Sequence, residues 1–182
     1  AWAKSSVRLG KSLTAGDFKL PAPASHQGPS TTVSAHVIGV IENQAPTRHL
    51  RWQVPVTKGE VRVDLERDLA KIAVVERHRG TGEVMVGLVH GFGFDAECAV
   101  GSTVAHDSHQ MIVVGTDETN MARAANALAA MGGGQVVIRN GETIGQVELP
   151  IAGLMSNERA EVVARKAASV LDGFKACGCR LN

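Results

Sequence analysis

The sequence predicts an α+β fold, a layered and mixed β-sheet with two main helices near residues 117–131 and 156–176. Two observations support this class. Runs rich in β-branched residues fill the first half of the chain, and two segments with apolar residues at helical spacing lie in the second half. The regular strand–helix repetition of a (β/α)₈ barrel is not found, so a complete TIM barrel is not expected.

The first half is expected to form strands joined by short turns. Residues 1–32 are punctuated by Pro and Gly and are expected to be irregular, apart from a brief strand at 7–9 and a short turn at 14–18. Gly59 supplies the backbone freedom for a hairpin turn between two later strands. Apolar and β-branched runs predict strands at 33–41, 49–56, 60–64, 71–78 and 84–90.

The second half is expected to combine further strands with the two helices. Apolar runs flank residues 102–109, and Thr116 or Asp117 is expected to cap a helix with a Met, Ala and Leu face. Asn140–Gly141 predicts a hairpin, which Pro150 ends, and Ser156 is expected to begin the second helix. Residues 33–182 are therefore predicted to form one domain, with a subdivision near 65–70 as an alternative.

Composition and charge exclude several classes of function. The chain has 19 basic and 18 acidic residues without long blocks of either sign, which gives no electrostatic case for binding nucleic acid or an anionic membrane. Aromatic residues make up only 3%, so stacking platforms for single strands are not expected. No apolar run approaches the ~20 residues of a membrane span. Three cysteines are too few for a disulfide framework, and a cytoplasmic protein is expected.

A polar cluster between two apolar runs is the main candidate site. It contains His106, Asp107, Ser108 and His109. Imidazole and carboxylate groups bind first-row metals and transfer protons near neutral pH. Histidines three residues apart do not share the face of a strand, so His106 and His109 reach one ligand only if the segment bends into a turn. The alternative is a buried structural turn whose His and Asp side chains cap backbone groups.

Polar residues at two strand ends are further candidates for the same cleft. Glu76, Arg77 and His78 end one predicted strand, and His90 ends the next, before the Gly-rich loop that contains Phe92. Strand ends that meet Gly-rich loops often build sites. An ion-pair network at a sheet edge is the alternative, and it is favoured for Arg77 taken alone.

Six motifs, in this order along the chain, resemble the C-terminal domain of bacterial adenine deaminase, a member of the amidohydrolase superfamily. They are residues 75–78, 91–93, 102–109, 112–116, 131–134 and 149–156. The resemblance runs from about Val7 to the end, and the HDSH and PIAGLMS motifs together are specific. His90 departs from the family, in which a lysine is expected at this position.

The resemblance implies an enzyme of purine salvage that hydrolyses adenine to hypoxanthine and ammonia with metal-activated water. Its binuclear centre of manganese or iron is expected in an N-terminal barrel outside this chain. The chain itself contains no His-x-His pair of the kind that would bind such a centre. The chain lacks an initiator Met, and the family's domain is expected to continue beyond Asn182. We therefore expect a fragment that is inactive alone.

Three roles for this domain are open. In the first, His106, Asp107, Ser108 and His109 face the barrel mouth, where they close over adenine or tune its protonation. In the second, the domain is a structural module that packs on the barrel or joins protomers of a homo-oligomer, without contact to substrate. In the third, His106 and His109 bind a separate metal ion with Asp107.

Overall fold

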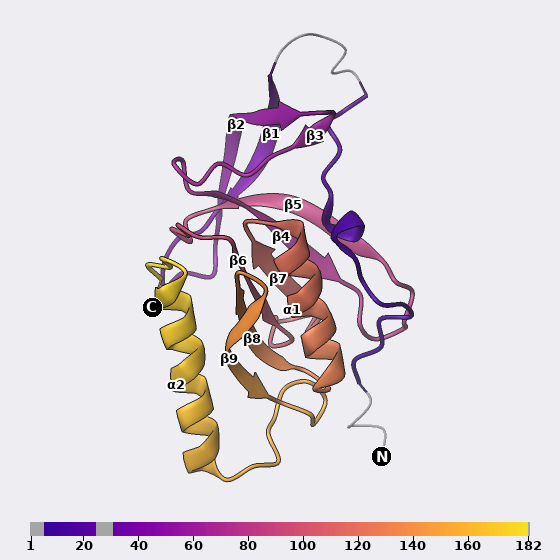
Figure 1. Ribbon diagram of the computed structural model, residues 1–182, viewed down its shortest axis with the longest axis vertical. Helices are drawn as coiled ribbons and strands as arrows, with labels where there is room; N and C mark the ends of the chain where they lie inside the picture. The colour runs from indigo at the N-terminus through magenta and orange to yellow at the C-terminus, as the bar shows by residue number, and fades with distance from the viewer. Residues whose placement is uncertain (1–5, 25–30, 182) are drawn as a thin grey trace.

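The computed structural model describes residues 6–24 and 31–181. These residues form one open, mixed sheet in the order β3-β2-β1-β5-β4-β7-β6-β8-β9, with helices against it (Figure 1). The strands are β1 (Thr32–Gly39), β2 (Arg48–Thr57), β3 (Glu60–Val61), β4 (Leu69–Val75), β5 (Val84–His90), β6 (Cys98–Ser102), β7 (Met111–Gly115), β8 (Gly134–Arg139) and β9 (Glu142–Glu148). The helices are the short 3₁₀ helix η2 (Ala15–Phe18), α1 (Glu118–Ala130) and α2 (Ala160–Ala176). The predicted α+β class is confirmed.

The strand directions bring two loops together at one edge of the sheet. Neighbouring strands pair antiparallel, except β1 and β5, which run parallel. Val75, the last residue of β4, lies opposite Val84 of β5 on one side and Met111 of β7 on the other. The segment that follows β4 therefore lies beside the loop that connects β6 to β7.

Helix α1 covers one face of the sheet. The Asp117 side chain accepts a hydrogen bond from the Asn120 N–H at 2.9 Å, so Asp117 rather than Thr116 caps the helix. The predicted apolar face is buried against β6, β7 and β8, with Met121 and Leu128 fully enclosed. Burial of this apolar surface provides most of the helix's stability.

Helix α2 covers only part of the other face, where it packs on β8 and β9. The helix begins at Ala160 and not at the expected Ser156. The Ser156 hydroxyl accepts a hydrogen bond from the Glu158 N–H at 3.2 Å, which favours a local turn over the helix. All three cysteines are free and buried, and all three belong to the core cluster that also contains Val170 of this helix. No helix of the described residues has the length and apolar character to cross a membrane.

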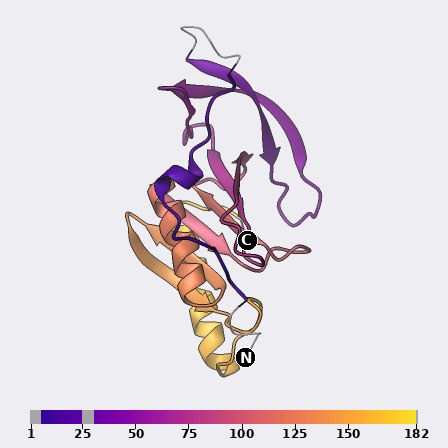
Figure 2. The same ribbon diagram turned by 90° about the vertical axis from the view of Figure 1, so that its right-hand side faces the viewer.

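Strands β1 and β2 form a long hairpin that arches away from the helices and has its own small core (Figure 2). The third strand is shorter than the expected 60–64, because the chain turns back at Asp64 to bridge Leu69. The expected strand at 7–9 is wrong: these residues belong to no strand, although the Arg8 N–H donates to the Arg77 carbonyl at 2.8 Å. The subdivision near 65–70 stays a prediction, although β1–β3 and β4–β9 share one sheet.

A buried ion pair ties β4 to α1 and to the N-terminal segment. Lys71 on β4 is fully buried, and its ammonium donates to the Glu118 carboxylate at 2.5 Å and to the Phe18 carbonyl at 3.3 Å. The Lys71 ammonium beside Glu118 lowers the pKa of that carboxyl, although burial alone would raise it. A buried charge without such partners would be strongly destabilising.

Candidate functional site

The HDSH loop, residues 103–110, connects β6 to β7 and is fixed at its start by Thr103. The buried Thr103 hydroxyl donates a hydrogen bond to the Gly153 carbonyl at 2.6 Å and accepts one from the Gly134 N–H at 2.8 Å. A bond from the His109 N–H to the Ala105 carbonyl, at 2.6 Å, closes the loop into a turn. The segment with the polar cluster is therefore bent into a turn. This is the condition under which His106 and His109 could act on one ligand.

The side chains of His106 and Asp107 point outward from this turn. They are 85% and 86% exposed, and the His106 Nδ1 atom contacts a carboxylate oxygen of Asp107. The His109 ring is partly buried and meets the His106 ring edge-on, with centroids 5.8 Å apart. Its buried Nδ1 atom has no hydrogen-bond partner among the described residues. His106 and Asp107 thus contact each other through their side chains, while Thr103, Arg77 and His78 hold the backbone of the turn.

Arg77 holds the backbone of the loop and is only 1% exposed. Its Nε donates to the His109 carbonyl at 2.6 Å, and its terminal nitrogens donate to the carbonyls of Ser6 at 3.2 Å and Ala152 at 3.1 Å. The Arg77 backbone N–H donates to Gln110 Oε1 at 3.1 Å. These partners are uncharged oxygens, and not the carboxylates of the ion-pair network considered as the alternative. Burial lowers the pKa of the guanidinium, which still stays charged at neutral pH.

Glu76 and His78 act on different parts of the site. The His78 Nε2–H donates to the Ser108 carbonyl at 3.2 Å, which gives the HDSH loop a second anchor. Glu76 folds back on its own turn, where its carboxylate accepts bonds from the N–H groups of His78, Arg79 and Thr81. Burial would raise the pKa of Glu76, but these donors outweigh it and lower the pKa to about 2. Glu76 is therefore ionised at neutral pH and shapes the turn that carries His78.

The loop after β9 completes the site, although the sequence patterns did not place it there. Gly153 accepts the hydrogen bond from Thr103 and has a φ of +73°. A Cβ atom at Gly153 would lie 2.7 Å from an Arg77 guanidinium nitrogen, so only glycine fits between the two loops. The PIAGLMS motif marks this loop in the sequence, but the spacing of the motifs does not show that it meets the HDSH loop.

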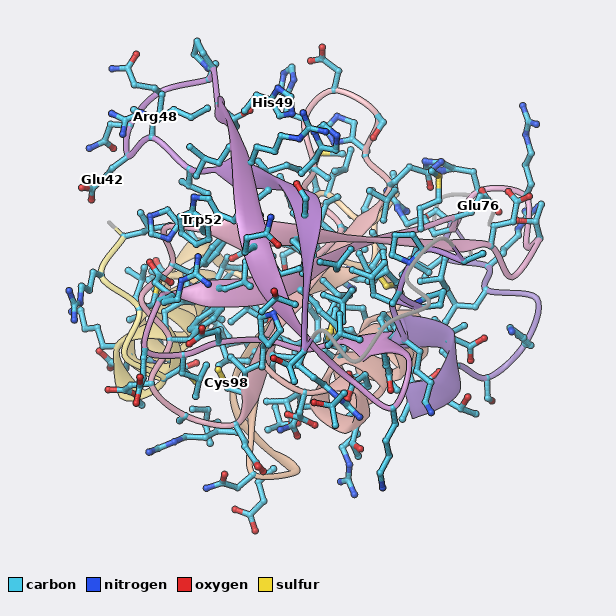
Figure 3. All side chains as sticks on the ribbon, turned by 90° about the horizontal axis from the view of Figure 1, so that it is seen from above. Glu42, Arg48, His49, Trp52, Glu76 and Cys98 are labelled. Carbon is cyan, nitrogen blue, oxygen red and sulfur yellow. The ribbon has the colours of Figure 1, made fainter. Side chains whose placement is uncertain are left out.

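His90 lies away from the HDSH loop, and the expectation that it shares the same cleft is wrong. Because β5 runs antiparallel to β4, His90 lies at the opposite end of this strand pair from Glu76. The His90 ring contacts the Trp52 ring, with centroids 4.9 Å apart, and Figure 3 shows Trp52 and Glu76 on opposite sides of the molecule. Phe92 follows β5 and lines a pocket of about 150 Å³ on the sheet face, together with Ser102, the residue directly before the HDSH loop.

A metal centre built from this loop alone does not fit the geometry. Among the described residues, no group of three or more His, Cys, Asp or Glu side chains is placed to hold an ion. The rings of His106 and His109 are inclined at 61°, and Asp107 contacts His106 instead of converging with both rings on one point. Zinc-type sites need at least three convergent protein ligands. The metal role expected for His106 and His109 is therefore not supported.

The geometry instead presents an imidazole and a carboxylate, in mutual contact, on a turn fixed by Thr103, Arg77 and His78. Such a pair can donate or accept a proton, or hydrogen-bond to a molecule that docks at this edge of the sheet. The fold and the loop together define a class: an α+β domain with a preformed polar loop whose His106 and Asp107 side chains are exposed.

Comparisons with known proteins give this class a family. The family model described as the adenine deaminase C-terminal domain matches residues 44–182. The chain is 53% identical, over its whole length, to adenine deaminase 3 of Rhizobium meliloti (strain 1021), of which it covers 30%. It is 51% identical over 99% of its length to adenine deaminase of Mesorhizobium japonicum, and 47% identical over 97% to that of Moorella thermoacetica, and covers 29% of each.

The chain therefore belongs to the adenine deaminase C-terminal domain family, and the family resemblance of its motifs is confirmed. It spans about 30% of the length of the curated relatives that it matches. The HDSH loop, the Arg77 segment and the loop after β9 all lie inside the matched region. The site described above is thus part of a larger protein in these relatives.

Proposed function

We propose that this chain is one domain of a cytoplasmic adenine deaminase and that its HDSH loop faces the active site of the whole enzyme. In this proposal the enzyme hydrolyses adenine to hypoxanthine and ammonia in purine salvage. Support comes from identities of about half the residues to proteins named adenine deaminase, over nearly the whole chain. The buried, free cysteines are in keeping with a reducing compartment.

The observation that carries the proposal is the contrast between the backbone and the side chains of the HDSH loop. Hydrogen bonds from Thr103, Arg77 and His78 fix the position of the backbone. The side chains of His106 and Asp107 are more than four-fifths exposed. A structural turn uses its polar side chains to satisfy nearby backbone groups. Here other residues hold the turn, so His106 and Asp107 are available to a ligand or partner.

The chemistry of deamination suits such a pair. The departing amine must receive a proton, and a positioned imidazolium or carboxylic acid group supplies one. We assign His106 the role of holding that proton and Asp107 the role of orienting the ring through their contact. When bound, divalent metal ions in this class of reaction activate the water. In the proposal the ligands of those ions, manganese or iron, lie outside this chain, since its own loop does not fit a metal.

The test uses the full-length enzyme that contains this domain, with the variants His106→Gln and Asp107→Asn. Ammonia release is measured over a range of adenine concentrations, together with the bound metal. General acid–base groups contribute typically about 10²–10⁴-fold, so we expect kcat to fall by about 100-fold or more while the metal content stays constant. Asp172→Asn, an exposed carboxylate on α2, is the matched control and should keep the wild-type turnover. Unchanged kcat and KM in both loop variants would contradict the proposal.

A second candidate function is a structural or oligomerisation module that packs on the catalytic barrel without touching substrate. It is favoured by large apolar side chains that remain exposed on the sheet, among them Met85 and Ile38. In that case the HDSH variants keep full turnover, and substitutions on the apolar surface change the assembly instead. The two candidates therefore differ in whether the HDSH variants lower ammonia release.

A further inference from the structure

The sheet face opposite α1 is only partly covered by the described residues. Val74 of β4 pairs with Met85 of β5 and with Ile112 of β7, so these three side chains share that face, and Ile38 of β1 continues it across the β1–β5 pair. We call the surface formed by these four residues the open sheet face. Met85 is 77% exposed, and Ile38 and Val74 are also exposed. Figure 1 shows α2 set to one side, over β8 and β9.

Hollows extend this face in both directions. A pocket of about 150 Å³, lined by Phe92, Ser102 and Phe174, lies where the face approaches α2. A second pocket, of about 430 Å³, lies along α2 beside its exposed Leu171. At the other end a pocket of about 340 Å³ is lined by His36 and other residues of the β1–β2 hairpin. An exposed apolar surface flanked by hollows is typical of a protein–protein interface, in which side chains of the partner fill the hollows.

The open sheet face is continuous with the HDSH loop. Ser102, the last residue of β6, lies opposite Ile112 on β7. Val104 follows two residues later, inside the HDSH loop, and is also exposed. A partner that covers the open sheet face therefore meets the HDSH loop at its margin.

We infer that the open sheet face is the surface on which the rest of the deaminase polypeptide docks. The inference rests on the proposed function only in taking this chain as one domain of a longer deaminase. The chain covers 30% of its Rhizobium meliloti relative, so most of that protein lies outside the matched domain and can supply a covering surface.

Oxidation of Met85 in the full-length enzyme tests this inference. A methionine as exposed as Met85 reacts with hydrogen peroxide almost as fast as in an unfolded chain, because susceptibility follows exposure. If the rest of the polypeptide covers it, oxidation in the native enzyme should be at least about ten-fold slower than in urea, at every protein concentration. Mass spectrometry of the peptide that contains Met85 gives both rates. A fast native rate, or protection that disappears on dilution as for a second copy, would overturn the inference.

A charge placed on the face provides a second measurement. Met85→Glu in the full-length enzyme should loosen the contact and speed limited proteolysis between this domain and the rest by about ten-fold. Ile144→Glu, at an exposed position on the edge strand β9, is the matched control and should leave the rate unchanged. Equal rates for Met85→Glu and wild type, or equal acceleration by both variants, would count against the docking surface.

These outcomes are independent of the role of the HDSH side chains. Protection of Met85 is measured in wild-type enzyme and in the Asp107→Asn variant, and the inference predicts it in both. If Asp107→Asn keeps full turnover while Met85 is protected, the proposed function fails and the docking surface stands. If turnover falls while Met85 is oxidised freely, the proposed function stands and the docking surface fails.

Discussion

Replacing Arg77 with methionine tests whether its guanidinium holds the HDSH loop. Arg77 donates to the carbonyls of His109, Ser6 and Ala152 at 2.6, 3.2 and 3.1 Å. Hydrogen bonds to charged groups contribute about 1.5–3 kcal/mol each, so the three contribute roughly 4–9 kcal/mol before desolvation is counted. Methionine removes the buried charge, which recovers a desolvation cost of several kcal/mol. The expected net loss in the free energy of unfolding is about 2–4 kcal/mol.

Urea unfolding of the chain measures this loss. With an m-value of about 2 kcal/mol per M, the midpoint should fall by about 1–2 M. The urea midpoint of Arg77→Lys should lie between those of wild type and Arg77→Met. A lysine ammonium cannot reach all three carbonyls that the forked guanidinium contacts. Arg165→Met, at an exposed position on α2, should stay within about 0.5 kcal/mol of wild type. A wild-type midpoint for Arg77→Met, or complete rescue by lysine, would refute the role of Arg77 as the anchor.

Three further predictions concern charge and burial. Glu76→Gln should cost about 1 kcal/mol at pH 7. The pKa of Glu76 is about 2 in the folded protein, below the ordinary 4.5. The extra stability of wild type over Glu76→Gln is therefore present above pH 4.5 and is lost as pH falls toward 2. Urea midpoints of both proteins at pH 7 and pH 3 check this. Glu118→Gln should cost about 3 kcal/mol, because the buried Lys71 ammonium keeps only the more distant Glu60 carboxylate, at 3.8 Å, as a charged partner. The double variant with Lys71→Met should cost less than the sum of the single losses, whereas additive losses would argue against a coupled pair. The three buried cysteines should react with a thiol reagent only after unfolding, as a colorimetric thiol count in native and denaturing buffer would show.

Most of the fold was predictable because local chemistry and tertiary structure agree. Asn140 and Gly141 have φ values of +50° and +82°, which their residue types tolerate, and the hairpin lies where they predict it. Ser156 shows the limit of such signals. A serine before an apolar periodic run favours a helix start, but the same hydroxyl also stabilises the short turn that the structure contains. The residue type alone does not decide between the two.

The candidate site was only partly predictable, because its contacts join distant segments. Arg77 and His78 contact the HDSH loop through hydrogen bonds to backbone carbonyls. Every residue has a backbone carbonyl, so the residue type at the accepting position does not reveal such a contact. Thr103 meets a carbonyl 50 positions away, and a single sequence does not reveal that pairing. The C-terminal ends of two adjacent strands lie at the same edge of a sheet only when the strands are parallel. Because β5 is antiparallel to β4, His90 lies at the opposite edge from Glu76, and the sequence gives no sign of this.

The most direct measurement of the central claim is the position of the HDSH loop in a crystal structure of the full-length deaminase with a bound, unreactive purine. We predict that His106 or Asp107 lies within hydrogen-bond reach of the purine, directly or through one water molecule. A structure in which the loop points to bulk solvent, or packs only against another protomer away from the purine, would contradict the claim that this domain presents it to the active site.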